Sequence, residues 1–187
     1  MNVIQTPLPG VVIVEPKLYG DSRGAFFEAW NRARYAEFGV PEICVQANVS
    51  FSEAGVLRGL HLQTPRVQSK LVSVLAGEIY DVAVDVRVGS PTFGRWTGVR
   101  LSAENHRQLL VPAGFAHGFA VTAGPATVMY QCDAYYAPTD ELTIRWDDPA
   151  LAIDWPVARP ILSDKDRQGL ALADVPEGRL PLHPGGL

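Results

Sequence analysis

The chain of 187 residues has little cysteine, little excess charge and no long apolar run. Its two cysteines, Cys44 and Cys132, are too few for a disulfide scaffold and lack the spacing of a CxxC metal site, so reduced thiols are expected. The formal charge of −4 gives no general attraction for nucleic acid or anionic membranes. No apolar run reaches the roughly 18 residues that span a bilayer, and the N-terminus lacks a secretory pattern. We therefore expect a soluble cytoplasmic protein with no nucleic-acid or membrane partner.

Glycine and proline are abundant instead, at 17 and 15 residues, which suits short strands and turns better than long helices. Strands are predicted over residues 11–15, 25–30, 78–88, 95–101, 108–111, 118–121, 126–133 and 142–146. Asn31 is a candidate cap for one short helix, about residues 32–38. The regular spacing of strands and turns predicts a mainly β fold, a sandwich or jelly roll with a few short helices.

The clearest periodic signal lies in residues 78–88, where Val82, Val84 and Val86 alternate with Asp81 and Asp85. A period of two over this length predicts a strand with one dry face. No internal repeat or linker divides the chain. We expect a single domain over residues 1–187, in which residues 171–187 form a loose C-terminal tail.

The four histidines are not equivalent. His106 lies in a polar stretch and His183 in the expected tail, so neither predicts a site. His61 and His117 lie in glycine-flanked apolar segments, residues 55–63 and 111–119. A titratable ring among apolar strands needs a partner or a function. A buried structural histidine is the competing interpretation for each.

One interpretation of His117 is a metal site. The pattern Pro112-x-Gly114-x-x-His117 resembles the second motif of the cupins, a jelly-roll superfamily whose metal-binding members take two His and a Glu from their first motif. That first motif would need His at the position of Gln63, and no carboxylate stands at the usual spacing. A metal-free cupin without a cofactor is therefore predicted.

The second interpretation is acid–base chemistry. Lys70 begins one apolar segment and Tyr130 lies within another. Alone, a solvated lysine and a packed tyrosine are the simpler interpretations. Together with His61 they form a coherent set, because an imidazole can take a proton, an ammonium can stabilise an enolate and a phenol can return a proton from the opposite side.

Several ordered segments then point to one family. They are residues 20–24 (GDSRG), 46–50 (QANVS), 56–63 (VLRGLHLQ), 90–94 (SPTFG), 101–105 (LSAEN), 112–119 (PAGFAHGF), 146–149 (WDDP) and 162–166 (LSDKD). With these segments the sequence resembles the dTDP-4-dehydrorhamnose 3,5-epimerases, cofactor-independent cupin enzymes of dTDP-L-rhamnose synthesis. The resemblance covers about residues 2–170. It implies a double-stranded β-helix, the jelly roll of the cupins.

The resemblance also implies a reaction. The substrate would be dTDP-4-dehydro-6-deoxy-D-glucose, whose C3 and C5 hydrogens flank the C4 ketone. Removing either proton gives an enolate, and returning it to the other face inverts the centre. By this likeness His61 is the base, Asp166 holds its second nitrogen, Lys70 faces the C4 oxyanion and Tyr130 is the general acid.

The remaining matched polar residues are expected to bind the substrate. With Lys70 they are Arg23, Glu28, Gln46, Asn48, Arg58, His117, Tyr136, Glu141 and Lys165. Arg23 and Arg58 each precede a glycine and suit the pyrophosphate as forked cations. In regular strand register Tyr136 shares a face with Tyr130 and can stack on thymine, with Tyr135 taking this role if a bulge shifts the register.

The spacing of Arg58 and His61 raises a geometric question, because residues three apart on a regular strand point to opposite faces. If both reach one pocket, either Gly59 marks a bulge or a partner chain supplies one of them. The resemblance implies a homodimer with strands exchanged between subunits, which would allow a composite site.

The sequence also departs from the family pattern. Ala47 and Val49 stand where an acidic residue and a His are usual, and Ser69 stands where Gly usually precedes the lysine. These changes leave the expected base, acid and lysine intact but bear on which carbon is deprotonated. A double epimerase is the main prediction and an epimerase of one centre its nearest rival. A metal-dependent cupin enzyme and a non-catalytic nucleotide-sugar binding module are two further hypotheses.

Overall fold

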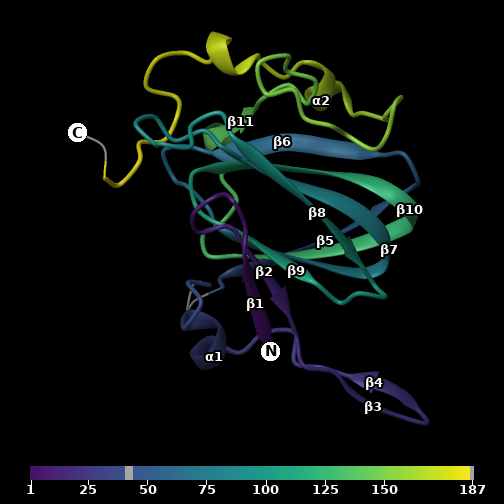
Figure 1. Cartoon of the computed structure of the whole chain (residues 1–187). Coiled ribbons are helices and arrows are strands. Elements are labelled where there is room, and N and C mark those ends of the chain that lie inside the picture. The colour runs from purple at the N-terminus through teal and green to yellow at the C-terminus, as the bar shows by residue number, and fades with distance from the viewer. Residues whose placement is uncertain (41–43, 186–187) are drawn as a thin grey trace.

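Antiparallel strands form most of the computed structural model, which describes residues 1–40 and 44–185 (Figure 1). The strands are β1 (Asn2–Gln5), β2 (Val12–Glu15), β3 (Tyr19–Asp21), β4 (Gly24–Phe26), β5 (Gln46–Ser52), β6 (Leu57–Gln63), β7 (Lys70–Asp85), β8 (Trp96–Ser102), β9 (Gln108–Val111), β10 (Phe115–Cys132) and β11 (Glu141–Thr143). The helices are α1 (Arg32–Ala36) and α2 (Asp164–Arg167), with 3-10 turns at Pro138–Asp140 and Leu172–Asp174. In the described residues no helix is long and apolar enough to cross a membrane.

Two long strands organise the fold. β7 and β10 pair antiparallel from Phe115 opposite Asp85 to Cys132 opposite Lys70, with register shifts between residues 121 and 128. These irregularities bend both strands, so that their two halves face each other across one core that contains Val72 and Ala83. The main sheet runs β1-β2-β9-β7-β10-β6-β11, with β5 added to β10 and β8 to β7. The mainly β, cupin-like jelly roll is confirmed.

Several expected elements differ in length. The strands predicted over residues 118–121 and 126–133 are parts of the single strand β10, and that predicted over 78–88 is the second half of β7. The strand predicted over 25–30 ends at Phe26, and that over 142–146 ends at Thr143. The predicted helix is present, and the Asn31 side chain caps it by accepting a hydrogen bond from the Arg34 N–H.

The second half of β7 has two buried faces rather than the single dry face expected from its alternation. Val82 and Val84 pack in a cluster with Leu151 and Leu172 from the C-terminal segment, which covers the outer face. Asp81 and Asp85, on the opposite face, are also completely buried. These two carboxylates are therefore inside the protein and need partners.

The C-terminal segment is packed through residue 183, which corrects the expectation of a loose tail over 171–187. Leu172 lies in a core cluster, and the Val88 N–H donates to the Pro181 carbonyl at 2.8 Å. The His183 N–H donates to the Val88 carbonyl at 2.9 Å. The segment is held against the body of the protein because it covers apolar strand faces. Residues 186 and 187 lie outside the described residues, and the single-domain boundary at 187 stays a prediction.

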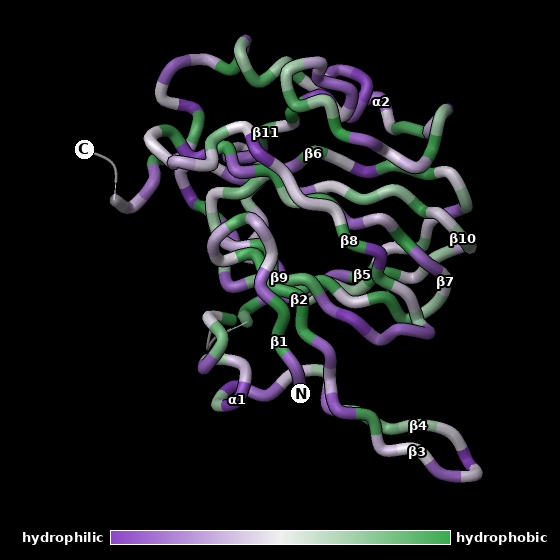
Figure 2. The backbone as a smooth tube through the Cα atoms, in the orientation of Figure 1, coloured by the Kyte–Doolittle hydropathy of each residue, from purple (hydrophilic) through white to green (hydrophobic). Residues whose placement is uncertain are grey.

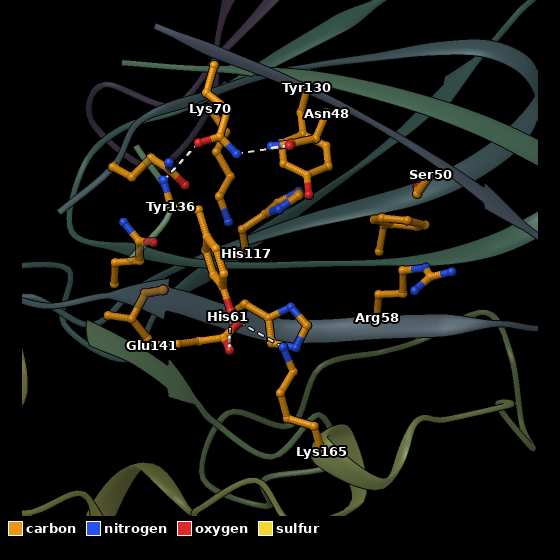
Figure 3. Close-up of a pocket in the computed structure, with 15 residues that line it drawn as sticks. Asn48, Ser50, Arg58, His61, Lys70, His117, Tyr130, Tyr136, Glu141 and Lys165 are labelled. Carbon is orange, nitrogen blue, oxygen red and sulfur yellow. Dashed lines mark hydrogen bonds and ion pairs between the residues drawn. The ribbon is translucent and has the colours of Figure 1, made fainter. Parts of the chain in front are cut away.

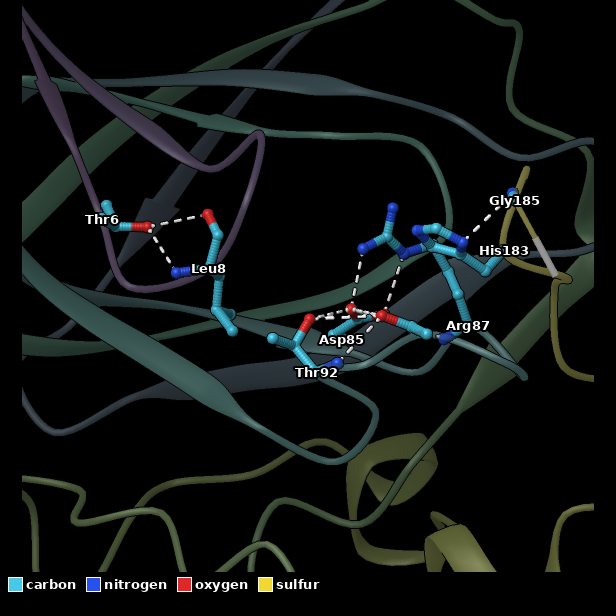
Figure 4. Close-up of polar contacts among 8 residues, drawn as sticks. Thr6, Leu8, Asp85, Arg87, Thr92, His183 and Gly185 are labelled. Carbon is cyan, nitrogen blue, oxygen red and sulfur yellow. Dashed lines mark hydrogen bonds and ion pairs between the residues drawn. The ribbon is translucent and has the colours of Figure 1, made fainter.

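A buried polar network holds the turn that follows β7 (Figure 4). The Asp85 carboxylate accepts two hydrogen bonds from the Arg87 guanidinium, at 2.9 and 2.7 Å. The hydroxyls of Ser90 and Thr92 donate to the same carboxylate at 2.5 and 2.6 Å. Burial would raise the pKa of Asp85, but these hydrogen bonds hold it well below the usual range.

The hairpin β3–β4 projects from the body of the molecule (Figures 1 and 2). At its base Tyr19 and Phe26 are exposed, at 56% and 70%, and their rings contact each other. Exposed aromatic pairs are typical of surfaces that meet another protein. Both rings also line a second pocket of the same chain, with Glu28 and Arg34.

Candidate active site

A pocket of about 350 Å³ opens at the side of the jelly roll where β5, β6, β7 and β10 converge (Figure 3). Polar side chains dominate its lining. The lining residues are Gln46, Asn48, Ser50, Arg58, His61, Leu62, Gln63, Gln68, Lys70, His117, Phe119, Tyr130, Tyr136, Glu141 and Lys165. Most of the residues expected to act on or bind a ligand are therefore in one place.

A His–Asp pair stands on one side of this pocket. His61 Nε2 lies 2.6 Å from Asp166 Oδ1, and Asp166 is only 3% exposed. Ser163 caps α2 and donates from its hydroxyl to Asp166 Oδ2 at 2.6 Å, which fixes the carboxylate. With Nε2–H donated to Asp166, Nδ1 keeps the lone pair. Burial lowers the pKa of His61 below its ordinary value, although the bond to Asp166 opposes this shift, so the ring is a neutral base near pH 7.

A lysine and a tyrosine face that pair from the other side of the pocket (Figure 3). Tyr130 of β10 pairs with Asn48 of β5, and Cys132, two residues on, pairs with Lys70 and Gln46, so these polar side chains share a strand face. Burial raises the pKa of Tyr130, which keeps the phenol protonated. Burial lowers the pKa of the Lys70 ammonium.

A bulge in β6 brings Arg58 and His61 to the same pocket. On β10 their partners are Phe119 and His117, so three steps on β6 match two on β10. Gly59 permits this with φ of +137°, and a Cβ there would lie 2.5 Å from the Cα of Gly118. Of the two explanations that the sequence leaves open, the bulge is the one found within a single chain.

A polar group stands at the pocket mouth. Lys165 Nζ lies 2.7 Å from Glu141 Oε1, and the Tyr136 hydroxyl donates to Glu141 Oε2 at 3.1 Å. The Tyr136 N–H donates to Gln46 Oε1 at 2.8 Å. Tyr136 follows the end of β10, so its position comes from this loop contact and not from regular strand register. Tyr135, which a shifted register would favour, is 72% exposed and does not line the pocket.

Comparison with known proteins decides the family. Residues 5–174 match the sequence profile described as dTDP-4-dehydrorhamnose 3,5-epimerase. The chain belongs to the dTDP-4-dehydrorhamnose 3,5-epimerase family.

Relatives and solved structures agree. The dTDP-4-dehydrorhamnose 3,5-epimerase of Pseudomonas aeruginosa is 52% identical over 177 residues, which are 94% of this chain and 98% of the relative. The crystal structure of the dTDP-6-deoxy-D-glucose-3,5-epimerase of Legionella pneumophila, in complex with dTDP-4-keto-L-rhamnose, matches with a TM-score of 0.95 at 50% identity and covers 97% of this chain and 98% of that one. A 3'-monoepimerase from Streptomyces bikiniensis in complex with dTDP-quinovose matches with a TM-score of 0.88 at 37% identity, over 95% and 93% of the two chains.

Two residues that the family resemblance suggests lie outside this pocket. Arg23, in the projecting hairpin, is 87% exposed in its side chain and pairs with Asp21 at 2.5 Å. Glu28 pairs with Arg34 beside α1. Neither lines the pocket of its own chain.

Two further residues of the site are not evident from the sequence. Asp81 lies 2.7 Å, through Oδ1, from His117 Nε2, which makes a second buried His–Asp pair. The only sign of Asp81 in the sequence is a charged residue within a valine-rich strand. The alternation of that strand places Asp81 on the face opposite the valines. Gln63, at the position that a cupin metal ligand would take, instead binds the loop after β10, since its Oε1 accepts from the Ala137 N–H at 2.8 Å. Among the residues that the structure describes, no cluster of three or more His, Cys, Asp or Glu is placed to hold a metal ion.

Proposed function

We propose that the pocket inverts both C3 and C5 of dTDP-4-dehydro-6-deoxy-D-glucose and so forms dTDP-4-dehydro-L-rhamnose. Membership of an isomerase family supports the reaction class. The observation that carries the proposal is the His61–Asp166 pair, which faces Tyr130 and Lys70 across one pocket. A base and an acid on opposite sides are what inversion at a carbon requires.

In the proposed mechanism, His61 Nδ1 takes the proton from the carbon next to the C4 ketone. The C–H electron pair becomes the enolate double bond, and the negative charge moves to the C4 oxygen, where the Lys70 ammonium stabilises it. Asp166 stabilises the imidazolium that forms. Tyr130 then donates its proton to the opposite face of the carbon, and solvent restores both groups. The same cycle at the second carbon completes the reaction.

The remaining lining residues bind the nucleotide. Arg58 has no carboxylate within ion-pair distance among the described residues, so its charge is available to the pyrophosphate. Lys165 also lines the pocket, where its ammonium is shared with Glu141. Gln46 and Asn48 offer amides to the ligand. Tyr136, at the mouth, is placed to stack on the thymine. Glu141 and His117 complete the proposed contacts.

A homodimer with exchanged strands would complete the site. The hairpin with Arg23 projects from the body with Tyr19 and Phe26 exposed, so it is free to reach a second copy. Arg23 and Glu28 would then act in the partner's pocket. Mixing chains that carry Arg23→Ala with chains that carry His61→Ala tests this, because a composite site restores activity in half of the pockets of a mixed dimer. No recovery after subunit exchange would exclude it.

One experiment tests the reaction. The 4-keto sugar nucleotide is incubated with the protein in D₂O, and NMR follows deuterium at each sugar carbon. Exchange at both C3 and C5 is expected. Exchange at one carbon would favour an epimerase of one centre. This alternative is tested because a 3'-monoepimerase is among the similar structures. No exchange by the folded protein would reject catalysis and leave a binding module, and activity that depends on a bound metal would favour a metal-dependent cupin enzyme.

We also propose that the protein is cytoplasmic. Its two cysteines, Cys44 and Cys132, are free thiols, which is what a reducing cytoplasm favours.

A further inference from the structure

Asp81 is a buried charge that the proposed reaction does not use. It lies on β7, is completely buried, and has one hydrogen-bond partner, His117, at 2.7 Å. Its second oxygen, Oδ2, has no hydrogen-bond partner within the described part of the chain. A carboxylate inside a protein is costly unless charges or hydrogen bonds compensate for it. The position of Asp81 therefore calls for a nearby cation.

The bend in β7 brings such a cation to the same pocket. Lys70 begins this strand, eleven residues before Asp81, and Val72 and Ala83 share one core cluster, so the two halves of the strand face each other. Lys70 and His117 both line the pocket, and both point into it in Figure 3. Asp81 does not line the pocket itself but is bonded to His117, which does.

The groups that most affect the pKa of Lys70 are Cys132 from β10, Asp81 from β7, Glu141 from β11 and Lys165 from α2. His61 from β6 also interacts with the Lys70 charge. Burial raises the pKa of the Cys132 thiol to about 11, so this group is neutral near pH 7. Glu141 already forms an ion pair with Lys165 at 2.7 Å. Of the two carboxylates in this set, Asp81 is therefore the one that is not already paired with a lysine, and its charge raises the pKa of Lys70.

We propose that Asp81 is a positioning residue of this pocket, acting as the counter-charge of Lys70 and as the acceptor that fixes the ring of His117. With Nε2–H donated to Asp81, His117 presents Nδ1 to the ligand as an acceptor for a hydroxyl. Because Asp81 raises the pKa of Lys70 against the effect of burial, it favours the positive charge that the enolate oxygen needs. The expected effect on rate rests on the proposed function. The effect of Asp81 on the charge of Lys70 and on the ring of His117 does not.

Asp81→Asn tests the proposal, because it keeps the shape and removes the charge. We expect kcat to fall about 10- to 100-fold, less than the roughly 10²–10³ that follows loss of an oxyanion donor itself, since Lys70 remains. Activity needs the ammonium and is lost as pH rises through the pKa of Lys70. Without Asp81 that pKa is lower still, so the alkaline limb of the kcat profile should move down by about 1 pH unit.

Glu78→Gln is the matched control. It removes one carboxylate from the same strand, but Glu78 pairs with Arg100 and Thr122, away from the pocket. The alkaline limb should stay in place in this variant. The proposal would be overturned if the alkaline limb of the kcat profile does not move in Asp81→Asn, or if it moves equally in Glu78→Gln.

Two NMR measurements separate this proposal from the proposed function. Titration of the Lys70 side chain, assigned with Lys70→Gln, should show the same downward shift in Asp81→Asn whether or not the protein turns over the sugar nucleotide. In the wild type, ¹⁵N spectra should show the His117 proton on Nε2 whenever the ring is neutral. A proton on Nδ1 would contradict the geometry, even if Asp81→Asn fails to fold.

Discussion

Gly59→Ala tests whether the close approach of β6 to β10 at the bulge determines the stability and activity of the protein. Gly59 has φ of +137°, and a Cβ there would lie 2.5 Å from the Gly118 Cα and 3.0 Å from the His117 carbonyl oxygen. Ordinary Cβ contacts begin near 3.4 Å, so β6 must move away from β10 by about 1 Å. Strained backbone costs about 1–3 kcal/mol and overpacking about 1–3 kcal/mol, which gives about 2–6 kcal/mol for both.

Gly55→Ala supplies the control. Gly55 also has a positive φ, +81°, but no atom lies within 4 Å of its Cβ position. It should therefore lose only the backbone part, about 1–3 kcal/mol. For a protein of this size each kcal/mol lowers Tm by about 2–4 °C, so thermal denaturation should show clearly the larger decrease for Gly59→Ala.

Activity gives a second readout of the same displacement. Arg58 and His61 flank Gly59, and an error of about 1 Å in a reacting group can cost about 10²-fold in rate. We expect deuterium exchange to slow by that factor in Gly59→Ala and to change little in Gly55→Ala. Equal Tm values for the two variants, or full exchange by Gly59→Ala, would refute the close approach of β6 and β10 as the determinant of the site.

Asp166→Asn should slow exchange by about 10³–10⁴-fold, because it disturbs the tautomer of His61, while calorimetry should find dTDP affinity within about threefold; an equal loss of affinity would assign Asp166 a structural role. Asp85→Asn should cost about 3–5 kcal/mol at neutral pH because it leaves the buried Arg87 charge unpaired. Since the pKa of Asp85 is depressed in the folded state, its contribution to the free energy of unfolding is present above the unfolded-state pKa near 3.9 and is lost as pH falls below that value. The same slope of unfolding free energy against acid pH in the wild type and in Asp85→Asn would contradict this. Val49→His, which restores the usual family residue, should leave the ratio of C3 to C5 exchange within about twofold, because Val49 points outward at 50% exposure while its neighbours Asn48 and Ser50 line the pocket; a changed ratio would show that this face affects the chemistry.

Elements with local signals were predictable from the sequence. The 108–111 strand and the helix capped by Asn31 appear where hydrophobic pattern and capping place them. The continuity of β10 was not predictable, since residues 122–125 (TAGP) have the composition of a turn. Pairing with β7 holds both strands together through this irregular stretch. That pairing links residues far apart in the chain, which a local pattern does not report.

The buried carboxylates show the same limit in the site. Asp81 alternates with valines, and this pattern is the same whether the polar face meets water or a closed interior. Only the rolled arrangement of β7 and β10 places Asp81 beneath His117. Arg23 shows the opposite case, because its motif is recognisable but its side chain is exposed and remote from the pocket of its own chain.

The sequence by itself identified the family, because segments such as 56–63, with His61, and 162–166, with Asp166, are long and ordered along the chain. Together with Lys70 and Tyr130, these residues carry the proposed acid–base chemistry. The tertiary structure decided how these groups meet. Asp166, 105 residues after His61, reaches it because the Ser163 cap starts a short helix over the end of the jelly roll. The bulge at Gly59 turns Arg58 and His61 to one side, which no strand periodicity predicts, because it depends on how closely β6 approaches the backbone of β10.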